Sequence, residues 1–164
     1  MPPPVFTTGQ VLDAPDVNTW FVPLAAYKAS NTDRTTTTMS GDPDLTVPVA
    51  ANAWYFVDVF LAYLCTSTTP RFKFTWLTPS GSGAASYHAL YVGTGGVQVN
   101  ELDLWTETHT AAITTASVTM GMSIRGTLLT GGTAGNFQLS WAADSTAAAM
   151  TLAARSILKL TRVG

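Results

Sequence analysis

The sequence predicts an all-β protein: an antiparallel β-sandwich, jelly-roll-like, that follows a short N-terminal arm with a helix. Three observations predict this fold class. Apolar and polar residues alternate in many short runs, as they do in strands with one buried face. Turns rich in glycine and proline separate these runs, and helical spacing of apolar residues is clear only near the N-terminus. A length of 164 residues suits a single domain of this class.

The N-terminal segment differs in pattern from the rest, so we expect an anchoring arm over residues 1–25 and a sandwich domain over residues 26–164. Asp13 suits a helix N-cap and Pro15 suits the first turn, which predicts a short helix that ends before Pro23. A helix this short is not stable alone, so its apolar face must dock on the sandwich or on a neighbouring subunit. The residues expected to anchor the arm are Phe6, Val11, Leu12, Val17, Trp20 and Phe21.

From residue 26 onward the pattern is that of strands. Phe72, Phe74 and Trp76 alternate with polar residues and are therefore expected to point into the core, as are alternate residues of the run 135–142. The expected strands lie near residues 26–30, 35–39, 44–49, 53–65, 71–78, 86–92, 102–108, 117–129, 135–142, 146–152 and 156–163.

The run Trp54–Cys65 is apolar on both faces, which is unusual for a strand of an antiparallel sheet. A sheet with one face on a core and one face in water needs a single apolar stripe. The second stripe therefore predicts cover from another sheet or from another copy of the chain. The residues expected to form an oligomer interface are Trp54, Phe56, Asp58 and Phe60. Asp58 is costly to bury unless it is paired, and an arginine of the same or of a neighbouring subunit is the expected partner.

Composition limits the function classes. Charged residues make up 11% of the chain, against about 25% in typical domains, which suits a surface covered by neighbours. The net charge of −2 and the scattered lysines and arginines do not predict nucleic-acid binding. The single cysteine excludes a disulfide framework within the chain. Because no leader is recognisable and the longest apolar run is too short to span a bilayer, we expect a protein made in the cytoplasm and not inserted in a membrane.

Residues that could carry chemistry are few. His88 or His109 could ligate a metal with Glu101, Asp103 or Glu107, but neither histidine shows the paired spacing that makes a metal site specific. Glu101 and Asp103 could also flank a sugar, as the carboxylates of a glycosidase do. We expect instead two ordinary histidines and a solvated acidic rim, and hence no cofactor, no metal and no enzymatic activity.

Trp105 is the candidate ligand contact, because it lies among acidic residues near a loop and an exposed aromatic ring can stack on a sugar. The loops near 79–86, 93–100 and 130–136 are expected to face outward, where host or glycan contact could occur. A carbohydrate-binding or host-receptor-binding module is therefore the alternative to a structural protein, and a hydrolase is a third class.

Two groups of segments carry a resemblance to phage proteins. Residues 6–18, with an aromatic, a glycine, a Val-Leu pair and a later hydrophobe followed by asparagine, resemble an opening segment of tail-associated proteins of phages that infect actinobacteria. The rest resembles a β-domain of small virion proteins of the same phages, except near residues 84–115. The segments that carry this second resemblance are 45–49, 52–55, 75–81, 126–128, 135–142 and 156–163.

The resemblance implies a non-enzymatic virion protein, either a minor tail or fibre component or a capsid-decoration protein. It implies a homo-oligomer, often a trimer in such proteins, whose partners are other virion proteins. A glycan on the host surface is a further candidate partner, which the outward loops could contact. The expected location is accordingly the virion, after synthesis in the host cytoplasm.

Overall fold

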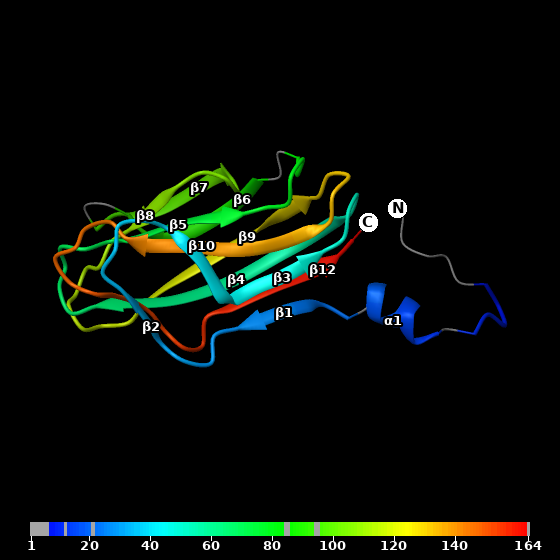
Figure 1. Cartoon of the computed structure of the whole chain (residues 1–164), viewed down its shortest axis with the longest axis horizontal. Coiled ribbons are helices and arrows are strands. Elements are labelled where there is room, and N and C mark those ends of the chain that lie inside the picture. The colour runs from blue at the N-terminus through cyan, green and yellow to red at the C-terminus, as the bar shows by residue number, and fades with distance from the viewer. Residues whose placement is uncertain (1–6, 12, 21, 84–85, 94–95, 164) are drawn as a thin grey trace.

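Two antiparallel sheets packed face to face form the protein, as the computed structural model of the chain shows for residues 7–11, 13–20, 22–83, 86–93 and 96–163 (Figure 1). The predicted β-sandwich is confirmed. The larger sheet runs in the order β1 (Leu24–Tyr27), β12 (Ile157–Arg162), β4 (Trp54–Cys65), β9 (Met120–Leu129), β6 (Ser86–Val92) and β7 (Gln98–Leu104). Two short strands extend it beside the far end of β4: β11 (Met150–Leu152) and β2 (Thr32–Arg34). The smaller sheet runs in the order β3 (Ser40–Val49), β10 (Gly135–Ala143), β5 (Phe72–Leu77) and β8 (His109–Ala111).

The strand pairing is that of a jelly roll. Four antiparallel pairs nest inside one another along the chain: β1 with β12, β3 with β10, β4 with β9, and β5 with β8. A long hairpin of these eight strands, rolled up so that its pairs alternate between the sheets, gives this order. The β6–β7 hairpin is inserted at the tip of that long hairpin, between β5 and β8. It joins the larger sheet through β9, where Tyr87 pairs with Gly126.

Aromatic side chains of the smaller sheet fill the space between the sheets. Trp76 of β5 stacks on Phe137 of β10, with ring centroids 4.9 Å apart. Phe72 stacks on Trp141 of β10 and on Tyr63 of β4. Each large side chain removed from water in this way contributes about 1.5–3 kcal/mol. The core-facing residues of β4 are buried as predicted: Tyr55, Val57, Val59, Leu61, Tyr63 and Cys65.

A buried ion cluster joins the edges of the two sheets. Lys28, directly after β1, is 1% exposed, and its Nζ lies 3.1 Å from the Asp42 carboxylate of β3 and 2.9 Å from that of Asp44. The indole Nε1 of Trp141 donates a hydrogen bond of 2.9 Å to Asp42 Oδ2, the same oxygen that Lys28 Nζ approaches most closely. Burial alone would raise the pKa of Asp42. The hydrogen bonds from Trp141 and Lys28, with the charge of Lys28, outweigh burial and lower this pKa.

The helix α1 (Ala14–Trp20) begins directly after Asp13, where the sequence predicts it, and projects beyond one end of the sandwich (Figure 1). The helix is far too short to cross a membrane, and no other helix occurs among the described residues. Val17 is half-buried and Val11 is 86% exposed. Asn18 borders a hollow of about 270 Å³ at the end of the sandwich. Three expected anchors, Phe6, Leu12 and Phe21, lie outside the described residues, as does the side chain of Trp20.

Several boundaries differ from the sequence-based expectations. The sandwich starts at Leu24, so the boundary expected after residue 25 falls inside β1. The strand expected over 35–39 is a loop, and the pairing strand is β2. The strand expected over 102–108 lies at 98–104 as β7, because the chain turns at Trp105.

Candidate functional site

The outward-pointing face of the larger sheet, called here the outer face, carries an apolar surface that the described residues leave partly exposed. The expected interface residues of β4 lie there: Trp54 is 44% exposed, and Phe56 and Phe60 are each 43% exposed. Neighbouring strands add further exposed apolar side chains to the same face. These are Tyr27, Leu90, Leu102, Leu104 and Ile157.

Strand register aligns these residues in rows across the sheet. In one row Tyr27 pairs with Ile157, Ile157 with Phe60, Phe60 with Ser123, and Ser123 with Leu90. This row crosses five strands and is apolar at four of its five positions. Rows of this kind are normally found under a second layer, because contiguous apolar surface is costly in water.

A charged row lies beside the apolar row. Lys159 of β12 and Arg125 of β9 flank Asp58 of β4, and His88 of β6 follows Arg125. Asp58 Oδ1 accepts a hydrogen bond of 3.2 Å from Arg125 Nε. The partner of Asp58 is therefore an arginine, as expected, but it belongs to the same chain. Because both side chains are exposed, this ion pair contributes at most about 1 kcal/mol to stability.

One end of the outer face is hollowed. A depression of about 540 Å³ begins at Phe60 and continues past Ala62 and Gly121 toward Arg155. The glycine contributes to the hollow, because it leaves the ring of Phe60 uncovered on that side. The depression is lined by aromatic, aliphatic and a few polar groups, which is the character of small-ligand and peptide sites.

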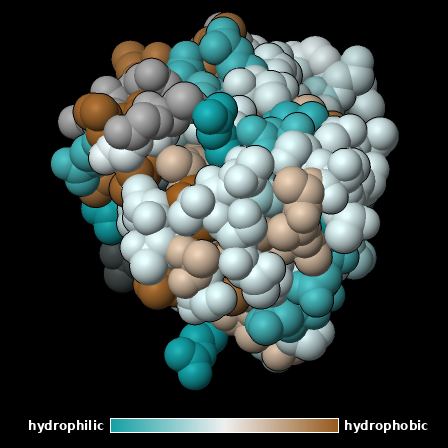
Figure 2. Space-filling view, turned by 90° about the vertical axis from the view of Figure 1, so that its left-hand side faces the viewer, coloured by the Kyte–Doolittle hydropathy of each residue, from teal (hydrophilic) through white to brown (hydrophobic). Residues whose placement is uncertain are grey.

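The end of the sandwich opposite α1 has a different surface. Figure 2 shows this end covered mostly by pale and teal residues, with the hydrophobic colour gathered toward the left of the view.

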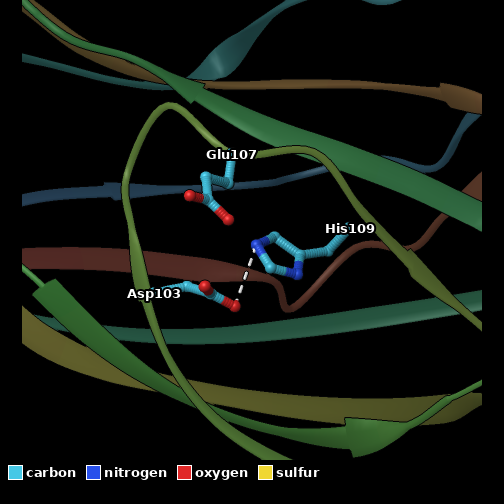
Figure 3. A group of neighbouring side chains, drawn as sticks. All are labelled: Asp103, Glu107 and His109. Atoms are coloured by element: carbon cyan, nitrogen blue, oxygen red, sulfur yellow. Dashed lines mark ion pairs between the residues drawn. The ribbon is translucent and has the colours of Figure 1, made fainter.

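A second cluster lies where β7 turns into β8. The side chains of Asp103, Glu107 and His109 converge there, and one potential ligand atom from each lies within 4.8 Å of the others. Figure 3 shows the imidazole edge directed toward both carboxylates, with His109 Nε2 3.5 Å from Asp103 Oδ2. This part of the described chain is where a metal ion could be held.

Residues of the cluster come from both sides of one short turn. Asp103 belongs to β7, Glu107 to the turn and His109 to β8. Sequence reasoning named these residues as one metal option but favoured ordinary histidines. It did not predict β8, because a strand of three residues shows no alternation of its own. The other candidates are not part of the cluster: His88 faces outward on β6, and the side chain of Glu101 lies outside the described residues.

Trp105 is a core residue, which corrects its expected role as a ligand contact. It is 2% exposed, stacks on Tyr87, and meets Trp76 and Phe137 edge-on. Its Nε1 donates a hydrogen bond of 2.7 Å to the carbonyl of Thr127. A tryptophan held on all sides in this way offers no ring face to a sugar.

The three loops expected to face outward lie at two opposite ends of the sandwich. Gly83 N donates to the carbonyl of Leu129, which places residues 79–83 beside residues 130–135 at the end where β9 finishes. The β6–β7 turn lies at the opposite end, because β6 runs antiparallel to β9. These loops cannot form one contact surface.

Comparison with known proteins gives fold neighbours only. No family model matches the chain, and no curated protein matches it. One similar solved structure is the N-terminal CBM22-1–GH10 part of xylanase 10B of Clostridium thermocellum, in complex with xylohexaose. It is 13% identical, with a TM-score of 0.35, over 86% of this chain and 28% of that one. Another is the VP2 subviral particle of infectious bursal disease virus, at 8% identity and a TM-score of 0.21, over 85% of this chain and 39% of that one.

The chain thus spans less than two-fifths of the length of these neighbours. The similarity is weak, to a structure with a carbohydrate-binding module and to viral capsid proteins. Similarity at this level of sequence identity and TM-score indicates no function for the chain.

Proposed function

We propose that this chain is a non-enzymatic structural protein of a phage virion, and that it assembles with further copies of itself through the outer face. The single observation that carries the assembly is the exposed apolar surface around Phe56 and Phe60 on β4. The virion class is supported by the resemblance of residues 6–18 and of the sandwich segments to small virion proteins, and by the low share of charged residues. Minor tail or fibre protein and capsid-decoration protein remain the two versions of this role.

The size of the outer face suits an interface. Six strands spaced about 4.8 Å apart, each with about seven residues at about 3.4 Å, make a face on the order of 650 Å². Stable protein interfaces bury about 800 Å² on each partner. The outer face with the adjoining hollow therefore approaches the required area without help from the arm.

The charges of the outer face suit a second copy as its occupant. Asp58 lies between two cations, Lys159 and Arg125, at the same level of the sheet. A facing copy can place its own Asp58 against Lys159, and such charge complementarity fixes the register of an interface. The flanking aromatic rings would supply the anchors of that interface.

The copy number in solution tests the proposal. We expect the purified chain to sediment as an oligomer at micromolar concentration. If it shares the oligomeric state of the virion proteins that it resembles, that oligomer is a trimer. Phe56→Lys and Phe60→Lys place a charge in the centre of the interface and should each yield a single-copy species. Leu77→Lys is the matched control, because Leu77 is 44% exposed on the smaller sheet, and this variant should sediment like the parent chain.

Two results would contradict this assembly. A parent chain that sediments as one copy at every concentration would remove the interface. An oligomer that persists in Phe56→Lys and Phe60→Lys, yet dissociates when residues 1–23 are deleted, would assign assembly to the arm.

For the particle itself, immunogold labelling separates the two virion roles, since label on tails supports the tail protein and label on heads supports the decoration protein.

A carbohydrate-binding or receptor-binding module is the second candidate, and one observation favours it. Trp54 and Phe60 expose aromatic rings on the outer face, and Phe60 borders the depression of about 540 Å³. Aromatic rings beside a polar-rimmed hollow can stack on sugar rings. A glycan array with the parent chain and with Trp54→Ala and Phe60→Ala tests this. Signals that both substitutions abolish would favour the binding module, and an array without signals would dismiss it.

A further inference from the structure

We propose that Asp103, Glu107 and His109 form a binding site for a divalent transition-metal ion of the zinc type. The site lies at the turn between β7 and β8, where the inserted hairpin returns to the framework of the jelly roll, and is separate from the outer face. It is independent of whether the chain assembles or what particle carries it.

The distances in the cluster suit a metal centre. Zinc–oxygen and zinc–nitrogen bonds of about 2.1 Å in a tetrahedral site place neighbouring ligand atoms about 3.4 Å apart. His109 Nε2 and Asp103 Oδ2 are already 3.5 Å apart, which is longer than a good hydrogen bond and close to that ligand spacing. All three ligand atoms lie within 4.8 Å of one another. The exposed Glu107 side chain therefore needs to move by at most about 1.5 Å to complete three ligands.

The histidine is held in place by its surroundings. His109 is 8% exposed, and its ring packs against those of Phe74, Tyr87 and Tyr91. The Tyr91 hydroxyl lies 3.4 Å from Nδ1. A metal-ligating histidine typically donates its other ring N–H to an oxygen, which fixes the tautomer with a free lone pair toward the metal. Tyr91 occupies the place of that oxygen.

The turn that carries Glu107 is also held. The carbonyl of Trp105 accepts a hydrogen bond of 3.1 Å from Trp76 N, and Glu107 N donates one of 3.1 Å to Leu104. The buried indole of Trp105 fixes the same turn to β9. The fold thus holds the imidazole and the backbone of the turn in place, and only the exposed Glu107 side chain has to become ordered when a cation binds.

The donor set indicates the class of metal. One imidazole nitrogen with two carboxylate oxygens suits zinc and related first-row ions, whereas calcium and magnesium prefer oxygen ligands only. Three protein ligands leave room for water on the exposed side of Glu107. The proposal assigns binding to this site and no reaction.

Titration with zinc tests the site. The chain, stripped with a chelator, should bind one Zn²⁺ per copy in isothermal titration calorimetry, and its midpoint of thermal unfolding should rise with Zn²⁺. Glu107→Gln removes a ligand charge at an exposed position and should weaken binding about tenfold or more. His109→Gln should abolish binding. The matched controls are His88→Gln, which removes the other of the two histidines, and Asp33→Asn on β2, and both should bind like the parent chain.

The outcomes separate cleanly. Binding that depends on Glu107 and His109 but not on His88 or Asp33 supports the site. No saturable binding to the parent chain overturns it, and the cluster is then only a metal-free contact between His109 and the two carboxylates. The proposal is also overturned if zinc binds Glu107→Gln with unchanged affinity, or if His88→Gln removes binding. Because Glu107 is exposed, its substitution should not disturb folding. The Glu107→Gln result therefore stands even if His109→Gln fails to fold.

Discussion

Lys28 illustrates how one residue can join two sheets. It follows the first strand of the larger sheet, and its ammonium group reaches Asp42 and Asp44 of the smaller one. Asp42 is fully buried and also receives the indole N–H of Trp141. Removing the charge of Asp42 would leave the buried Lys28 ammonium with the partly exposed Asp44 carboxylate as its remaining counter-charge, and the loss of a partner from a buried charge is costly.

We therefore expect Asp42→Asn to lower the free energy of unfolding by about 3 kcal/mol or more, measured by urea denaturation at neutral pH. The same substitution at Asp33, which is exposed and accepts a hydrogen bond from Thr151, should change it by about 0.5 kcal/mol at most. Equal effects of the two substitutions would contradict the role of the cluster.

The pH dependence of stability follows from the same carboxylate. The pKa of Asp42 in the folded protein lies below its ordinary value of 3.8, so the unfolded chain binds a proton more readily. The stabilisation from this group is complete above pH 3.8 and is lost as the pH falls through the lower folded-state value. Urea denaturation at several pH values between neutral and acidic should show this loss in the parent chain. In Asp42→Asn the free energy of unfolding should depend less on pH in the acidic range.

At the scale of elements, the end of the sandwich near α1 is built from three loops fastened together. Asn52 N donates to the carbonyl of Gly131, and Thr130 Oγ1 donates to that of Ala50. Gly131 in turn lies against the backbone of Gly81, so closely that a Cβ atom there would overlap the Gly81 carbonyl oxygen. Gly132, its neighbour, has nothing within 4 Å of the corresponding position.

These two glycines form a matched pair for a test. Gly131→Ala must push the turn at Gly81 away and should lower the free energy of unfolding by about 1–3 kcal/mol. Gly132→Ala should be neutral or stabilise the protein by less than about 1 kcal/mol, because it only restricts the unfolded chain. Chemical denaturation of both variants decides this, and a harmless Gly131→Ala would mean that the loops are not in close contact.

The elements also show what a sequence can predict. The β4 strand was predictable because its alternation is long, and its core-facing side is buried as expected. The sequence could indicate that its other side needs cover, but not that the described residues leave that side partly exposed. The short β8 strand and the Lys28 cluster were not predictable, because each depends on segments that meet only after the sheets have packed. For the same reason the sequence could offer a metal site among Asp103, Glu107 and His109 as one option, but could not show that these three side chains meet.

At the scale of the whole molecule, folding and attachment are expected to depend on different parts: the sandwich folds, and the arm attaches. The four nested strand pairs begin at Leu24, and none of them uses α1. The arm should therefore be dispensable for folding, whatever it contributes to attachment.

Deletions on either side of β1 test this division. Deletion of residues 1–23 should change the free energy of unfolding by less than about 1 kcal/mol. Deletion of residues 1–28 also removes β1 and Lys28, leaves Asp42 buried without its cation, and should cost at least about 3 kcal/mol. If the shorter deletion already destabilises the protein as much as the longer one, the arm is part of the folded unit.

The tip of the inserted β6–β7 hairpin is a place where the molecule should tolerate changes in sequence and length. All four nested pairs close without it, so its tip can vary in length and residue type while the remaining framework keeps its hydrogen bonds. Any replacement must still bring rings equivalent to Tyr87 and Tyr91 to the inner side, where they shield Trp105 and His109 from water. Within that constraint, this extension is the natural point at which to graft a foreign peptide for display, or at which related chains could diverge in what they hold.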